Sequence, residues 1–170
     1  MRNMNLKETV IECVREKINL CYELPDEEVY EIIDERILLT DQSSYLTFEE
    51  RRRLKKEVFD ALRKLDILQA LIEDTEITEI MVNGTNPIFI EKNGVIEEAE
   101  VRFSSEEQLD NMIQKVVAGA NRVVNTSSPI VDARLEDGSR INIVLPPVSL
   151  GGAILTIRRF PKEPKQAVLQ

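Results

Sequence analysis

The sequence contains no histidine and no tryptophan, and among its 170 residues there are only two cysteines, Cys13 and Cys21. Without histidine the chain cannot form a Ser-His-Asp or Cys-His nucleophile, a histidine proton relay or a histidine-containing zinc site. The two cysteines lie on one predicted helix, too far apart for a disulfide if that helix is intact. We therefore expect two reduced thiols in the core and a fold that does not depend on disulfides.

The chain has fewer basic than acidic residues: 22 Lys and Arg against 31 Asp and Glu, for a net charge of −9. This balance argues against bulk binding of nucleic acid, which needs clustered positive charge. No apolar run approaches the roughly 20 residues of a membrane span, and no basic-then-apolar leader opens the sequence. The hydrophobic content of 42% is too high for disorder. We therefore expect a soluble cytosolic chain.

Glycine is absent before Gly84, and Pro25 is the only proline in that stretch. A stretch without breakers favours helices, whereas the punctuated second half favours strands and turns. Three apolar patterns at helical spacing precede the boundary: Leu6, Val10, Val14, Ile18 and Cys21; Val29, Ile32, Ile33 and Ile37; and Leu54, Val58, Ala61, Leu62 and Leu65. Thr47 and Glu50 match a capping box at the start of the third. Residues 1–66 are therefore predicted to form a three-helix lobe.

The run 51–56 (RRRLKK) is interpreted as a solvated helix face, because acidic residues flank it on both sides. Beyond the lobe, a short helix is predicted at 68–73 and a longer one from the Ser104–Glu107 capping signature to Gly119. Strands are predicted at 79–82, 87–91, 130–135, 139–145 and 153–159. This mixed order predicts an α+β domain over 67–160 with a mostly antiparallel sheet, and not a Rossmann series.

Phosphate-binding loops of the usual kinds are missing, since neither GxxxxGK[ST] nor GxGxxG occurs. Such loops need several glycines so that backbone N–H groups converge on the phosphate oxygens, and Gly151-Gly152 stands alone. Glu97, Glu98 and Glu100 are interpreted as a solvated strand edge, with no partner acid. We therefore expect that this chain alone is not an enzyme and has neither a catalytic residue nor a metal site.

The last third of this acidic chain is basic, because residues 111–170 hold 8 basic and 4 acidic side chains. Strand alternation places Arg140 on the face opposite Ile141 and Ile143. A hairpin centred on Ser149 sets Arg140 directly across from Arg158. A three-residue loop ending in a left-handed Gly138 likewise sets Arg134 across from Arg140. The predicted register therefore aligns three arginines across three strands.

Like charges directly opposite one another are destabilising, so this row needs anions between its members. One interpretation is internal neutralisation by Asp132 and Glu136, which share the face. The other is a bound multivalent anion, for which forked guanidinium donors suit phosphate. The residues alone leave these two interpretations open.

Several segments, in order, resemble the N-terminal domain of CpaF-like secretion ATPases. These motors serve type II and type IV secretion and pilus assembly, including the Flp (tight-adherence) pilus branch. The matching segments are LIEDTEITEIMVNG (71–84), SPIVDARL (128–135), DGSRIN (137–142), LPP (145–147) and LTIRRF (155–160). The resemblance covers about 65–162.

The resemblance implies a PAS-like α/β domain joined by a linker, here 161–170, to a RecA-like ATPase domain. By motif match, Arg140 and Arg158 would reach the phosphates of ATP held mainly by that other domain, and Arg134 also matches a family arginine. Arg159 would point to the opposite face. Walker A, the Asp box, Walker B and the His box are absent from this chain. The resemblance therefore predicts an N-terminal fragment, or a chain that ends where the motor would begin.

For the longer protein, the resemblance implies an ATPase that uses ATP with Mg²⁺ and assembles as a homo-hexamer at the cytoplasmic face of the inner membrane. Its partners would be the ATPase domain, neighbouring subunits and an inner-membrane platform protein, with no nucleic acid. No nucleotide is expected to stay bound to this chain alone. Two alternatives stay open: a PAS-like small-molecule sensor, and a protein-interaction module whose arginines are paired internally.

Overall fold

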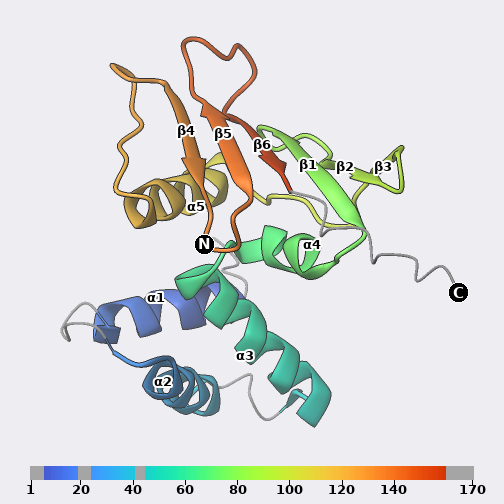
Figure 1. Ribbon diagram of the computed structural model, residues 1–170. Helices are drawn as coiled ribbons and strands as arrows, with labels where there is room; N and C mark the ends of the chain where they lie inside the picture. Colours follow the sequence, from blue (N-terminus) through green and yellow to red (C-terminus); the bar gives the residue numbers. More distant parts are fainter. Residues whose placement is uncertain (1–5, 19–23, 41–44, 160–170) are drawn as a thin grey trace, which may run out of the picture. The chain divides into compact units, whose positions relative to one another are not determined.

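The computed structural model describes residues 6–18, 24–40 and 45–159 (Figure 1). The chain divides into two compact units, Met1–Gln69 and Ala70–Gln170. We call them the helical unit and the sheet unit. Cys21 and the predicted linker 161–170 lie outside the described residues. Within the described ranges, no helix is both long enough and apolar enough to cross a membrane.

Three α-helices lie in the described part of the helical unit before its last residues: α1 (Leu6–Ile18), α2 (Asp26–Leu38) and α3 (Phe48–Arg63). Their apolar stripes meet in one core, as the spacing predicts: Val10, Val14, Val29, Ile33, Ile37, Val58 and Phe59. The ring of Phe59 stacks on Tyr30 with the centroids 4.0 Å apart. A 3₁₀ turn, Asp66–Leu68, follows α3. The prediction of three amphipathic helices is confirmed.

The expectation of core thiols is wrong for Cys13, which is a free and exposed cysteine. Cys13 immediately precedes the buried Val14, and successive residues of an α-helix are about 100° apart around its axis. The apolar stripe that buries Val10 and Val14 therefore leaves Cys13 outside the core.

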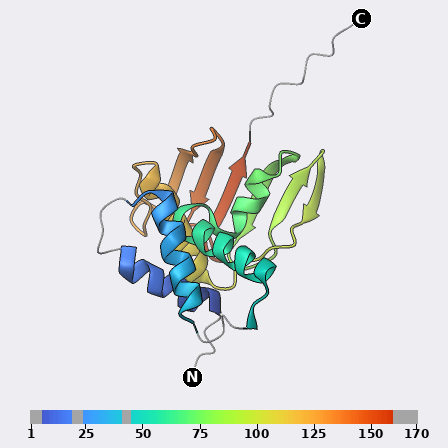
Figure 2. The same ribbon diagram turned by 90° about the horizontal axis from the view of Figure 1, so that it is seen from below.

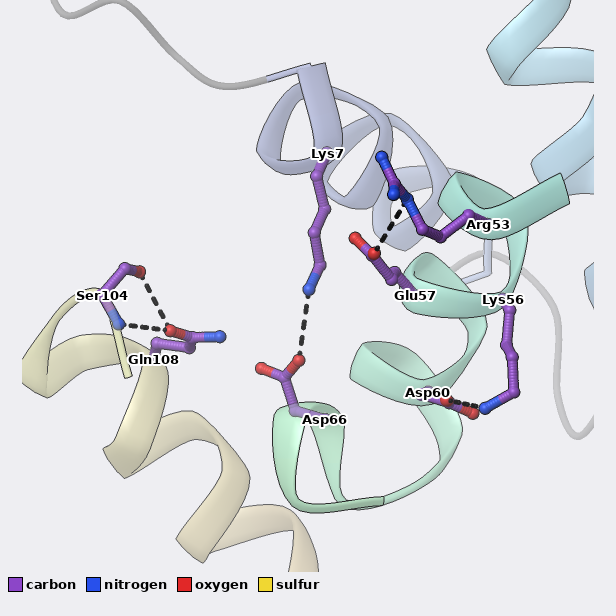
Figure 3. A network of polar contacts seen from close by, with 8 residues as sticks. All are labelled: Lys7, Arg53, Lys56, Glu57, Asp60, Asp66, Ser104 and Gln108. Carbon is purple, nitrogen blue, oxygen red and sulfur yellow. Dashed lines mark hydrogen bonds and ion pairs between the residues drawn. The ribbon is translucent and has the colours of Figure 1, made fainter. Parts of the chain in front are cut away.

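Ion pairs within the helical unit account for most of the basic run 51–56. Lys56 pairs with Asp60 at 2.8 Å and Arg53 with Glu57 at 3.8 Å (Figure 3), while Lys55 pairs with Asp34. These contacts support the interpretation of this run as a solvated helix face. In the same unit, Lys7 Nζ of α1 lies 3.4 Å from Asp66 Oδ1.

The predicted capping box begins α3. The Glu50 backbone N–H donates to Thr47 Oγ1 at 3.2 Å, and the Thr47 backbone N–H donates to Glu50 Oε2 at 2.8 Å. Two hydrogen bonds to the Glu50 carboxylate, first from the Thr47 backbone N–H and then from the Thr47 hydroxyl, lower the pKa of Glu50 from its ordinary value of 4.5. Because the folded-state pKa is depressed, this contribution to stability is present above pH 4.5 and is lost as the pH falls through the lowered value.

Replacing Thr47 with alanine should lower the free energy of unfolding by about 1 kcal/mol, since it removes the side-chain cap and one partner of Glu50. The measurement is urea denaturation at pH 7, with NMR titration of the Glu50 carboxyl. We expect the Glu50 pKa to rise toward its ordinary value. Thr47→Ser, which keeps the hydroxyl, is the matched control. Equal stability of Thr47→Ala and the unaltered chain would show that the cap contributes nothing.

The described part of the sheet unit holds six strands and one long helix, α5 (Glu106–Gly119); the short helix α4 (Gln69–Glu73) precedes the first strand. The strands are β1 (Ile77–Asn83), β2 (Phe89–Lys92), β3 (Val95–Glu98), β4 (Ile130–Arg134), β5 (Arg140–Val144) and β6 (Ile154–Arg158). They form one antiparallel sheet in the order β3-β2-β1-β6-β5-β4, which the labels in Figure 1 show and Figure 2 views from below. The predicted α+β class is therefore confirmed.

One face of the sheet and one side of α5 are apolar and buried. On the strands these residues are Ile80, Val82, Ile90, Val131, Ile141, Ile143, Leu155 and Ile157; on α5 they are Leu109, Met112, Ile113, Val116 and Val117. The opposite face of β4, β5 and β6 carries the arginines and is exposed. The alternation that defines the core thus also fixes which face presents charge.

The start of α5 differs from the prediction by one residue. Its N-cap is Ser105, whose Oγ accepts from the Gln108 backbone N–H at 3.1 Å. The Gln108 Oε1 in turn accepts from the Ser104 backbone N–H at 2.8 Å (Figure 3). The glutamine three residues after Ser105 therefore selects the second of two adjacent serines as the cap.

Candidate functional site

The three arginines named from the sequence lie side by side on the exposed face. Arg134 of β4 is paired with Arg140 of β5, and Arg140 is paired with Arg158 of β6. The predicted register is therefore confirmed at both strand pairs. We call these three residues the arginine row. On the far side of Arg158 the row ends at Glu79 of β1.

The turn between β4 and β5 sets the first half of this alignment. Gly138 has a φ of +86°, in the left-handed region that the three-residue loop requires. The Asp137 carboxylate accepts hydrogen bonds from the Ser139 backbone N–H at 2.9 Å and from its hydroxyl at 2.8 Å. The conformation of Gly138 and the hydrogen bonds of Asp137 fix the length of this loop. A shift of one residue in the strand register would separate Arg134 from Arg140 and would also expose Ile141.

Two carboxylates already contact the arginine row. Asp132 Oδ2 lies 3.4 Å from an Arg140 guanidinium nitrogen, and Glu79 Oε2 lies 3.5 Å from one of Arg158. The two arginine side chains are 57% and 73% exposed. Exposed pairs of this kind contribute about 0.2–1 kcal/mol. The carboxylates therefore reduce the repulsion within the row but leave both guanidinium groups accessible to another anion.

Glu136, the other residue that could have neutralised the row, makes no ion pair with an arginine among the residues that the structure describes. It lies in the β4–β5 turn, beyond the last paired residue of β4. Internal neutralisation thus comes from Asp132 and from Glu79 on β1, and not from the pair of residues expected from the sequence.

A groove of about 610 Å³ adjoins one end of the arginine row. Its lining residues are Ala120, Arg122, Asp132, Ala133, Arg134 and Arg140. This volume lies within the range of about 300–1,000 Å³ typical of small-molecule sites. Three guanidinium groups and one carboxylate give the lining a net charge of +2. We call this the β4 groove, and its charge and donors suit an oxyanion.

Comparison with known proteins identifies the family. Residues 61–170 match the sequence model of the Type II/IV secretion system protein family. The chain belongs to this family. Its predicted membership is therefore confirmed, and the arginine row lies within the matched region. The narrower CpaF-like assignment, the PAS-like fold and the hexamer stay predictions.

Relatives of this secretion-family chain are found in an archaeon and in bacteria. It is 34% identical over 138 residues to MJ0781, an uncharacterized protein of Methanocaldococcus jannaschii, a match covering 71% of this chain and 18% of that protein. It is 31% identical over 96 residues to the type IV secretion system protein VirB11 of Brucella suis, a match covering 56% of this chain and 27% of the relative.

Among solved structures, the secretion-family chain is similar to the VirB11 ATPase of the Brucella suis type IV secretion system, determined in complex with sulphate. The TM-score is 0.53 and the sequence identity 28%, over 58% of this chain and 31% of that one. The chain thus spans between 18% and 31% of the length of these relatives.

Arg122 lines the β4 groove but was not selected as a site residue from the sequence. It follows α5 in an irregular loop, where strand alternation carries no information about the direction of a side chain. The available signal was Asn121, because asparagine often ends a helix in the left-handed conformation. Its φ is +52°.

Arg159 lies away from the arginine row, as predicted. Its guanidinium donates to the backbone carbonyl oxygens of Asp74 and, at 3.3 Å, of Ile77, and its backbone N–H donates to the Thr78 carbonyl at 2.9 Å. Arg159 therefore ties β6 to the segment that leads into β1. Nearby, the pKa of Asp74 is lowered, first by a hydrogen bond from the Glu76 backbone N–H and then by Lys92. These contacts give Arg159 a structural role.

The described residues contain no group of three or more Cys, Asp or Glu side chains that could hold a metal ion. Among the described residues, Asp132 supplies the one carboxylate that lines the β4 groove. Hard cations such as Mg²⁺ take oxygen ligands, and nucleotide sites supply them from one or two carboxylates together with phosphates. The groove is thus suited to phosphate oxygens directly and offers little to a cation.

Proposed function

We propose that the sheet unit is the nucleotide-clamping N-terminal region of a secretion or pilus-assembly ATPase. Arg140 and Arg158, with Arg134 beside them, would contact the phosphates of ATP held mainly by an ATPase domain outside this chain. The observation that carries this proposal is the arginine row itself, three guanidinium groups on adjacent strands of one exposed face. A polyphosphate is a ligand whose charges are spaced to meet several of them at once.

Three physical arguments favour phosphate as the partner of the row. Like charges placed directly opposite destabilise a sheet, so an anion between them is favourable. The ion pair of Arg140 with Asp132 is exposed on both sides, and in the pair of Arg158 with the partly buried Glu79 the arginine is exposed, so both arginines can exchange partners at little cost. Guanidinium groups present forked donors that match phosphate oxygens in pairs. The solved VirB11 ATPase supports this choice, since it was determined in complex with sulphate, another tetrahedral oxyanion.

The proposal assigns this chain a positioning role. The sheet unit supplies arginines, its sequence has no glycine-rich cradle, and its described residues offer no group of carboxylates for Mg²⁺, so alone it would bind nucleotide weakly and would not hydrolyse it. A nucleotide touched by two domains favours the arrangement in which both sets of contacts form. ATP would thereby bias the position of the sheet unit against the ATPase domain, and loss of the terminal phosphate would release that bias.

The wider setting follows the family resemblance. The longer protein would be a CpaF-like motor that assembles as a homo-hexamer at the cytoplasmic face of the inner membrane. The helical unit would contact neighbouring subunits or an inner-membrane platform protein. Seven of its described apolar residues are already buried against one another, so these contacts would use its exposed surface.

A second candidate is a protein-interaction module in which the arginines are neutralised internally. The contacts of Arg140 with Asp132 and of Arg158 with Glu79 favour it. The small-molecule sensor finds less support, because such a site needs an apolar enclosure and the β4 groove is lined by charged side chains. The nucleotide clamp and the protein-interaction module differ in one respect: only in the clamp does phosphate displace the carboxylates of Asp132 and Glu79 from the arginines.

The test is a titration of the 170-residue chain with a nonhydrolysable ATP analogue, following the side-chain N–H resonances of its arginines by NMR. We expect shifts at Arg134, Arg140 and Arg158, with a dissociation constant on the order of 1 mM from a few exposed contacts. Adenosine, which lacks phosphate, should leave them unmoved. Unshifted resonances in the row, with the analogue in excess, would favour the interaction module.

A further inference from the structure

The β4 groove and the arginine row overlap without coinciding. Arg134 and Arg140 belong to both, whereas Arg158 is not among the groove-lining residues and contacts Glu79 instead. Arg122 lines the groove from the loop after α5. The concave part of this surface therefore gathers its own set of three arginines, shifted from the row toward the edge strand β4.

Backbone hydrogen bonds fix the position of Arg122. The Arg122 N–H donates to the Val117 carbonyl at 2.9 Å, and the Asn121 N–H donates to the Ala118 carbonyl at 3.0 Å. With Asn121 at a φ of +52°, these two bonds form a Schellman motif at the C-terminus of α5. Arg122 is thus held in a defined place relative to the last turn of the helix.

The loop that follows Arg122 is also anchored. The Gln114 side-chain amide donates to the Val124 carbonyl at 3.3 Å, and the Val124 side chain is buried. The Asn125 side chain then accepts from the backbone N–H groups of Ser127 and Ser128 at 2.9 and 3.0 Å. The segment joining α5 to β4 therefore carries Arg122 on a tethered backbone, which lowers the entropy lost when its side chain binds an anion.

Asp132 lies inside the same groove. It lines the groove together with the three arginines, and its carboxylate contacts Arg140 at 3.4 Å. One carboxylate cannot neutralise three guanidinium groups, so the lining keeps a net positive charge. The same carboxylate repels any other anion that approaches Arg140.

We propose that the β4 groove is a phosphate subsite, in which Arg122 is an additional binding residue and Asp132 competes with phosphate for Arg140. The inference rests on the proposed function, since it assigns further residues to the phosphate contacts begun by the arginine row. The ligand class is a polyphosphate, either free or as part of a nucleoside triphosphate. The guanidinium group of Arg122 donates paired hydrogen bonds to the phosphate. Binding also requires Arg140 to exchange its contact with the Asp132 carboxylate for a contact with a phosphate oxygen.

The test uses the 170-residue chain and inorganic tripolyphosphate, with affinities measured by calorimetry at fixed low ionic strength. Arg122→Gln should weaken binding about fivefold, as loss of one exposed charge contact predicts. Asp132→Asn should strengthen it by up to about fivefold, because the competitor is lost while the size of the side chain is kept. Arg122→Lys, which keeps the charge but not the fork, should fall between Arg122→Gln and the unaltered chain.

The control variant is Arg102→Gln, which removes an exposed arginine of the sheet unit that contacts Glu98 outside the groove. It should bind tripolyphosphate like the unaltered chain. Thermal unfolding of each variant checks that the fold is kept; since the Schellman bonds of Arg122 are made by its backbone, its substitution should leave them intact. Repeating the series with a nonhydrolysable ATP analogue distinguishes the sources: equal affinities assign the subsite to phosphate alone, and tighter binding of the analogue assigns it to a nucleotide.

Two failures of this experiment have different meanings. Should Arg140→Gln weaken binding while Arg122→Gln and Asp132→Asn match the control, the subsite is overturned and the proposed function stands. Should Arg140→Gln and Arg158→Gln also match the control, the row does not bind phosphate, and the proposed function fails together with the subsite.

Discussion

Replacing Arg140 with alanine should lower ATP turnover about a hundredfold in a secretion ATPase that contains this chain. Removing one positioned donor to a reacting oxyanion typically costs 10²–10³ in rate, and the exposure of Arg140 places it at the lower end of that range. The measurement is steady-state phosphate release at saturating ATP, with kcat and KM determined separately. A fall in kcat with little change in KM would mean that Arg140 acts mainly as the transition state forms.

Stability measurements separate this functional role from a structural one. Arg140 makes an exposed ion pair with Asp132, so its loss should change the free energy of unfolding by less than about 1 kcal/mol. Arg102→Ala removes an arginine that is equally exposed but lies outside the groove, and should keep full turnover. Turnover of Arg140→Ala equal to that of Arg102→Ala would remove Arg140 from the phosphate contacts.

Truncation of Ile141 to alanine should have the largest effect on stability, lowering the free energy of unfolding by about 3–4 kcal/mol. Ile141 is fully buried and lies between Ala133 of β4 and Ile157 of β6, on the face opposite the arginine row. Removing its side chain loses buried apolar area and leaves a cavity that a rigid sheet fills only in part. Urea denaturation of the chain measures the loss.

Ile154 provides the matched control, because it lies on the neighbouring strand β6 with its side chain on the exposed face. Ile154→Ala should cost less than about 1 kcal/mol, since its side chain is already 36% exposed and its truncation opens to water instead of leaving an enclosed cavity. Equal losses for the two variants would contradict the assignment of the buried and charged faces of the sheet.

The alignment of the arginines was predictable from the sequence because two local rules reinforce each other. The turn residues Asp137 and Gly138 set the loop length, and the alternation around Ile141 and Ile143 allows only a register that keeps isoleucines on one face. Together these rules place Arg134 across from Arg140, and the same alternation with a hairpin centred on Ser149 places Arg158 across from Arg140, without any knowledge of the tertiary structure.

Other features depended on tertiary information that such rules do not carry. All four residues of β3 are exposed, so this strand lacks the apolar alternation by which a strand is recognised, although the acidic residues Glu97 and Glu98 were correctly interpreted as a strand edge. Arg122 reaches the groove from a loop, and its direction depends on how α5 ends. The pairing of Arg158 with Glu79 required the order of strands in the sheet, in which β6 lies next to β1.

The most direct test is a structure of this chain joined to its ATPase domain, with a nonhydrolysable ATP analogue bound. The account predicts guanidinium nitrogens of Arg140 and Arg158 at hydrogen-bond distance, about 2.7–3.2 Å, from phosphate oxygens, with the contacts to Asp132 and Glu79 broken. An analogue whose phosphates lie far from β5 and β6, with Arg140 still on Asp132 and Arg158 still on Glu79, would contradict it.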